Sequence, residues 1–108
     1  MAAALLQKTV DVAELCSTGP EIITNGWVVL EDDKATQPAE NIAPIVRNDL
    51  LKSLGTDDAK KFNDTLDAVS AKIDTKTLAQ LYYDVAVGHK TLAEVATAWL
   101  KAAGFVSA

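Results

Sequence analysis

Residues 10–34 read VDVAELCSTGPEIITNGWVVLEDDK, and two parts of this stretch are typical of strands. Residues 10–15 alternate apolar and acidic positions, as a strand with one buried face does. Residues 26–33 contain a continuous Trp-Val-Val-Leu run, which fits a strand buried on both faces of an α/β sheet. The stretch therefore predicts two strands with a short segment between them.

The segment between these strands predicts a short helix. Ser17 and Thr18 are candidate N-caps, and Pro20 suits a first helical turn. Asn25 followed by Gly26 is a helix stop signal.

Further along the chain, residues 42–47 (IAPIVR) form another short apolar run, which predicts a third strand. Pro44 would keep this strand at a sheet edge or a bulge. Asn48 or Asp49 could then cap a short helix that ends at Gly55.

The second half of the chain predicts three helices. Over residues 56–73 an apolar stripe recurs at spacings of four, three and four, formed by Phe62, Leu66, Val69 and Ile73. Asp74 or Thr75 caps a second helix, which ends at Gly88 and has an apolar face made of Leu78, Leu81, Tyr82 and Val85. Thr91 and Glu94 form a capping box for the last helix, which we expect to bury Leu92, Val95, Ala96, Trp99 and Leu100 before Gly104.

The predicted fold class is α/β, with a few short strands followed by about three to four helices.

Composition excludes several classes of function. The net charge is −5, with fifteen acids and ten bases, and this argues against nucleic acid as a partner. A single cysteine allows no internal disulfide and no multi-cysteine metal site. The glycines follow no phosphate-loop pattern, so we expect no nucleotide and no cofactor. The start of the chain lacks the features of a signal peptide, and no apolar run is long enough to span a membrane.

Candidate catalytic and metal-binding residues have plainer explanations. His89 lies in a Gly-His-Lys turn, where a solvated imidazole is expected, and nothing in the spacing pairs it with Cys16 as a nucleophile. Residues 31–33 (Glu-Asp-Asp) lack the alternating spacing of a calcium loop, so they read as a solvated strand end. Trp27 and Trp99 read as core aromatics, with ligand stacking as the alternative. No enzyme is expected.

Residues 10–34, followed by PAENIAPIVR at residues 38–47, closely resemble the substrate-binding proteins of ABC importers for glycine betaine, carnitine and choline. The closing helix LAEVATAWLKAAG, residues 92–104, is similar to the C-terminal end of that family. The resemblance implies a periplasmic-binding-protein-like (type II) fold with two lobes, which close on a solute in the cleft between them. Residues 1–15 would form the end of the second lobe and the hinge crossover, and residues 16–108 would form the C-terminal portion of the first lobe.

The resemblance also implies a ligand site and partners. Two tyrosines of the family's aromatic cage for quaternary ammonium groups fall here on Cys16 and Glu40, so specificity is expected to differ. Glu40 is either an exposed loop acid or a carboxylate that pairs with a cationic ligand carrying N–H donors. The predicted ligand-binding residues are Cys16, Ser17, Thr18, Gln37, Glu40 and Asn41. The implied partners are a small quaternary, cationic or polar solute, an ABC permease, and the N-terminal lobe or a second copy of the chain, in the periplasm or outside the cell.

An interpretation from another class remains open. The chain could be a stand-alone module that self-associates through an incomplete sheet edge and binds no small ligand. An enzyme that uses Cys16 is a third and weaker alternative.

Overall fold

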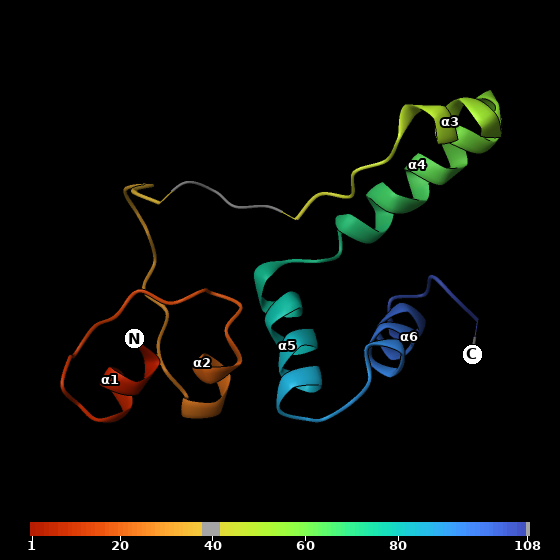
Figure 1. The fold of residues 1–108 in the computed structure, drawn as a ribbon. Helices are drawn as coiled ribbons and strands as arrows, with labels where there is room; N and C mark the ends of the chain where they lie inside the picture. The colour runs from red at the N-terminus through yellow and green to blue at the C-terminus, as the bar shows by residue number, and fades with distance from the viewer. Residues whose placement is uncertain (38–41, 108) are drawn as a thin grey trace. The chain divides into compact units, whose positions relative to one another are not determined.

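The computed structural model of the chain describes residues 1–37 and 42–107, which divide into two compact units. The first unit combines Met1–Glu31 with Asp74–Ala108, and the second unit is Asp32–Ile73. Six helices form within the described residues (Figure 1).

The first unit contains four helices: α1 (Ala2–Leu6), α2 (Pro20–Asn25), α5 (Thr75–Ala86) and α6 (Leu92–Ala102). Helix α5 contacts both α2 and α6, so α2 lies beside a helix that is about fifty residues later in the sequence (Figure 1). This long-range contact brings the Cys16–Thr18 turn close to the C-terminal helices. The short helix α1 was not predicted from the sequence, although its alanines and leucines have high helix propensity.

Local cap chemistry sets where the helices of the first unit begin and end. Asp74 accepts a hydrogen bond from the backbone N–H of Thr77 at 2.7 Å, and Thr91 and Glu94 form the predicted capping box. Gly26 ends α2 in the left-handed region, with φ of 62°. These predictions are confirmed. The predicted cap of α2 is wrong, because its N-cap is Gly19 and neither Ser17 nor Thr18 takes that position.

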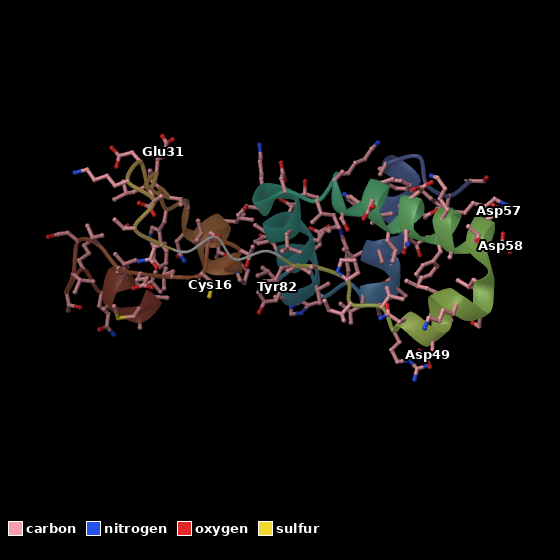
Figure 2. All side chains as sticks on the ribbon, turned by 90° about the horizontal axis from the view of Figure 1, so that it is seen from above. Cys16, Glu31, Asp49, Asp57, Asp58 and Tyr82 are labelled. Carbon is pink, nitrogen blue, oxygen red and sulfur yellow. The ribbon has the colours of Figure 1, made fainter. Side chains whose placement is uncertain are left out.

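The second unit contains a helical hairpin, which is made of α3 (Asn48–Leu54) and α4 (Thr56–Ser70) joined at Gly55. The N-cap of α3 is Arg47, so the prediction of Asn48 or Asp49 is wrong. Asp57 and Asp58 project from the first turn of α4 (Figure 2), where their charge offsets the positive end of the helix dipole.

The α/β fold class, with a periplasmic-binding-protein-like lobe, is contradicted, because the described residues form no strand and no sheet. The predicted strands at 10–15, 26–33 and 42–47 are non-helical segments without strand pairing. Many of their apolar side chains are uncovered: Val28 is 84% exposed and Ile45 is 92% exposed. An apolar run marks a strand only where a neighbouring strand pairs with its backbone and another layer covers it, and the described residues supply neither.

Burial in the first unit is also smaller than the sequence predicts. Ala79 and Val95 are its buried apolar side chains among the described residues, whereas Leu92 is 76% exposed and Tyr82 is 51% exposed. Both exposed residues line an open apolar groove of about 410 Å³ on α5 and α6, together with Val95 and Thr18. The predicted apolar stripes are therefore present on these helices but only partly covered.

Candidate ligand-binding site

The turn at Cys16–Thr18 precedes α2 and is closed by a backbone hydrogen bond from the N–H of Gly19 to the carbonyl of Cys16, at 2.8 Å. Cys16 and Ser17 are exposed, and Thr18 is half-buried. Figure 2 shows that the Cys16 sulfur projects away from the ribbon. The turn therefore presents a thiol and a hydroxyl to their surroundings.

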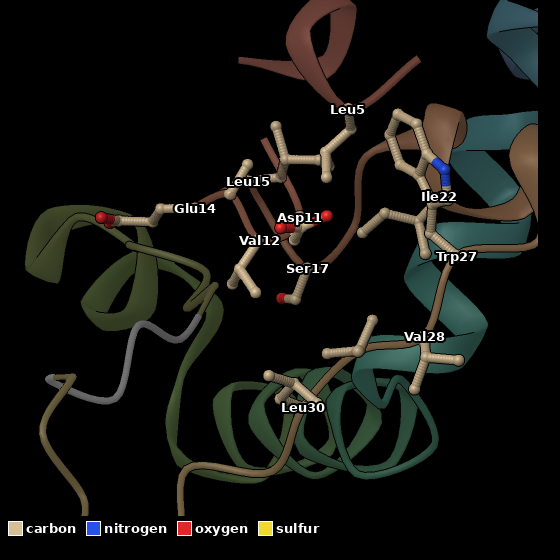
Figure 3. Close-up of a pocket in the computed structure, with 12 residues that line it drawn as sticks. Leu5, Asp11, Val12, Glu14, Leu15, Ser17, Ile22, Trp27, Val28 and Leu30 are labelled. Atoms are coloured by element: carbon tan, nitrogen blue, oxygen red, sulfur yellow. The ribbon is translucent and has the colours of Figure 1, made fainter. Parts of the chain in front are cut away.

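Ser17 borders a pocket of about 450 Å³ that is formed entirely within the first unit (Figure 3). This volume is in the range of small-molecule sites. The pocket is lined by residues from α1, from the segment before the turn, from α2 and from the segment after it, namely Leu5, Asp11, Val12, Ala13, Glu14, Leu15, Ser17, Ile22, Trp27, Val28, Val29 and Leu30.

Three of the lining side chains, those of Asp11, Ser17 and Trp27, carry chemistry suited to a cation. Figure 3 shows the Asp11 carboxylate and the Ser17 hydroxyl near the middle of the lining residues, while the Glu14 carboxylate points away from the others. The half-buried indole of Trp27 lies on the same pocket, and an indole face attracts cations. A carboxylate, a hydroxyl and an indole among apolar side chains could hold a small amphipathic cation.

The end of α2 positions Trp27. Gly26 adopts the left-handed conformation, and the N–H of Trp27 donates to the carbonyl of Ile22 at 3.0 Å. This bond turns the chain back across α2 and places the indole beside Ile22, which also lines the pocket.

A second and wider groove, of about 780 Å³, lies between α2, α5 and α6 of the same unit. Ser17 lines this groove too, together with Trp99 and with polar residues from the first half of α5, among them Lys76 and Gln80. The centroids of the Trp99 and Phe105 rings are 6.2 Å apart, so Trp99 packs partly against the C-terminal segment. Trp99 is half-buried.

The six predicted site residues fall in different parts of the structure. Ser17 borders the pocket and the wider groove, and Thr18 borders the apolar groove on α5 and α6. Cys16 lines none of these three cavities. Gln37 belongs to the second unit, while Glu40 and Asn41 lie outside the described residues.

Sequence reasoning missed Asp11 as a pocket residue and treated Trp27 as a core aromatic. The signal for Asp11 was weak, because an acid in an apolar-acidic alternation normally marks the solvent face of a strand. Asp11 and Trp27 are sixteen positions apart, and no local pattern predicts that they line one pocket.

His89 occupies the turn after α5, as the sequence predicts, with a positive φ of 55°. Across this turn Lys90 forms an ion pair with Asp84 at 2.9 Å, and this bond is the main reason why the pKa of Asp84 lies below its usual value. The charges of Lys90 and Asp84 therefore stabilise this turn.

Within residues 1–37 and 42–107, no group of three or more His, Cys, Asp or Glu side chains could hold a metal ion. The helices of this described part are too short or too polar for any of them to cross a membrane.

Comparison with known protein families places the chain in a class. Residues 1–102 match the family of solute-capturing components of ABC importers. The chain belongs to the family described as the substrate-binding domain of the ABC-type glycine betaine transport system, OpuAC. Members of this family take part in transport without enzymatic chemistry, on the extracellular or periplasmic side of the membrane. No curated protein and no solved structure matches the chain.

Proposed function

We propose that this protein captures a small cationic solute carrying N–H donors and presents it to an ABC permease. The family match over residues 1–102 supports solute capture. The proposed change of specificity rests on one observation: the positions that resemble the family's two cage tyrosines hold Cys16 and Glu40. A cage without these rings loses attraction for a bare trimethylammonium group, and a carboxylate adds an acceptor for N–H donors.

The proposed ligand contacts are Cys16, Ser17 and Thr18 from the turn before α2, with Gln37, Glu40 and Asn41 from the following loop. The pocket beside Ser17 supports a cationic ligand, since the Asp11 carboxylate and the Trp27 indole line it. No partner for the Asp11 carboxylate is found among the described residues, so a bound cation would meet an uncommitted acceptor.

We further propose that residues 1–15 belong to one lobe of a two-lobed binding protein and residues 16–108 to the other. The solute would lie in the cleft between the lobes, and closure of the lobes would retain it. In this arrangement the proposed partner of the chain is the N-terminal lobe or a second copy of the chain.

A second candidate function is self-association without a small ligand. The uncovered apolar side chains favour it, notably Val28 at 84%, Ile45 at 92% and Leu92 at 76% exposed. Sedimentation velocity distinguishes the two functions: this alternative requires a dimer whose stability does not respond to any of the solutes named below.

Ligands in which methyl groups replace N–H donors one at a time test the proposal. Sarcosine, dimethylglycine and glycine betaine share a carboxylate and carry two, one and no N–H groups on nitrogen. We expect the protein to bind dimethylglycine about 10- to 100-fold more tightly than glycine betaine, because a hydrogen bond to a charged group is worth about 1.5–3 kcal/mol. Glu40→Gln should remove most of this preference in isothermal titration calorimetry.

Glu31→Gln is the matched control, because it removes the same charge outside the proposed contacts. It should leave the preference for dimethylglycine unchanged. Equal preferences in the Glu40→Gln variant and the unchanged protein would show that Glu40 is an exposed loop acid.

A further inference from the structure

The carboxylate of Asp32 organises the start of the loop that leads to the proposed ligand contacts. Oδ1 accepts hydrogen bonds from the backbone N–H of Thr36 at 3.0 Å and from its hydroxyl at 2.9 Å. Oδ2 accepts from the backbone N–H of Gln37 at 2.8 Å. Both carboxylate oxygens therefore hold residues four and five positions further along the chain, all within the second unit.

The turn held by these bonds is strained at one position. Ala35 adopts a left-handed conformation with φ of 48°, and its N–H donates to the carbonyl of Asp32 at 3.2 Å. A residue with a Cβ rarely adopts this conformation, because the Cβ comes too close to the backbone, and so the conformation needs support from its surroundings. The three bonds to the Asp32 carboxylate supply that support.

The ionised form of Asp32 is the one that accepts these bonds. The N–H of Gln37, followed by that of Thr36, lowers the pKa of Asp32 below its usual value of 3.8. Because the folded-state pKa is lowered, the stabilising contribution is complete above that usual value. It is lost as the pH falls through the lowered pKa.

We propose that Asp32 is a positioning residue for solute binding, which fixes the backbone of Gln37 so that its side chain reaches the bound solute. This inference rests on the proposed function, since Gln37 is one of the proposed contacts. It assigns a role to one acid of the Glu31-Asp32-Asp33 run, which the sequence alone identified only as a solvated strand end.

Asp32→Asn tests the proposal, with Asp33→Asn as the matched control. Both variants remove one negative charge at adjacent positions, but the Asp32 side chain is the one bonded to Thr36 and Gln37. In the unchanged protein, the amide proton signals of Thr36 and Gln37 should move as acidification titrates Asp32. The Asp32→Asn variant should lose this response, its two amides should exchange with solvent at least about tenfold faster, and dimethylglycine should bind about 5- to 10-fold more weakly.

The two readouts separate the possible failures. Unaltered amide signals in Asp32→Asn, or equal effects in Asp33→Asn, would overturn the positioning role. Altered amide signals with unchanged dimethylglycine affinity would overturn its link to binding while leaving the proposed function intact. If the unchanged protein binds none of the three methylated glycines, the proposed function itself fails, although the amide signals still report on the turn.

Discussion

Replacement of both Cys16 and Glu40 by tyrosine is expected to strengthen the binding of glycine betaine by roughly 5- to 700-fold. Each aromatic face within reach of a quaternary ammonium group contributes about 0.5–2 kcal/mol, so two rings contribute about 1–4 kcal/mol. These are the positions at which the sequence resembles the family's cage tyrosines but lacks the rings. Isothermal titration calorimetry with the Cys16→Tyr/Glu40→Tyr variant measures the change.

A leucine pair at the same two positions is the control for apolar burial. Cys16→Leu/Glu40→Leu removes the same carboxylate and thiol and adds apolar surface without a ring face. It should bind glycine betaine clearly more weakly than the tyrosine pair. Equal affinity in the two double variants would show that no aromatic cage forms at these positions.

Val95→Asp is expected to lower the free energy of unfolding by about 3 kcal/mol or more. Val95 is 7% exposed on α6 and is one of the two buried apolar residues among those described. A carboxylate there would be desolvated without a partner, and a buried unpaired charge is one of the few changes that destabilise a protein this strongly. Urea unfolding followed by circular dichroism measures the loss.

Leu92→Asp provides the matched comparison on the same helix. Leu92 is 76% exposed at the start of α6, where a negative charge also suits the helix dipole, so its replacement should change the free energy of unfolding by no more than about 0.5 kcal/mol. A loss as large as that of Val95→Asp would show that the groove on α5 and α6 is covered in solution.

Some helix boundaries could be predicted from the sequence, because their causes are local. The capping box of α6 needs only Thr91 and Glu94, three residues apart, and the left-handed end of α2 needs only Gly26. The failure at α3 is instructive: Asn48 lies inside the helix, and Asp49 forms an ion pair with the N-cap residue Arg47 at 3.4 Å. Several good capping residues in a row leave the first turn ambiguous.

The strands were predicted wrongly because an apolar run carries no information about what covers it. Residues 26–33 have the composition of a buried strand, yet Val28 and Leu30 are 84% and 72% exposed. A strand depends on backbone partners distant in the sequence, whereas a helix satisfies its own hydrogen bonds. An apolar stripe on a helix likewise does not show what covers it, and Tyr82 and Leu92 belong to such stripes yet remain largely exposed.

The candidate site was predictable in part. The short helix that follows Cys16–Thr18 was predicted from local signals, although its cap was not. Ser17, one of the predicted contacts, borders a pocket. That Asp11 and Trp27 line one pocket depends on how the segments on either side of α2 fold back, so the residue order alone could not reveal it. The use of the six predicted residues as ligand contacts stays a prediction, for Cys16, Ser17 and Thr18 as much as for Gln37, Glu40 and Asn41.

Direct binding of a small solute tests the central claim most directly. We would titrate the purified protein with sarcosine, dimethylglycine, glycine betaine and choline by isothermal titration calorimetry, and would follow thermal unfolding in the same solutions. The account predicts saturable binding of sarcosine or dimethylglycine, whose positively charged nitrogen carries N–H donors, with stabilisation of about 2.7 kcal/mol at 100 times the dissociation constant. No heat of binding and no thermal stabilisation by any of the four, from a protein that sediments as a tight dimer, would contradict solute capture and favour self-association.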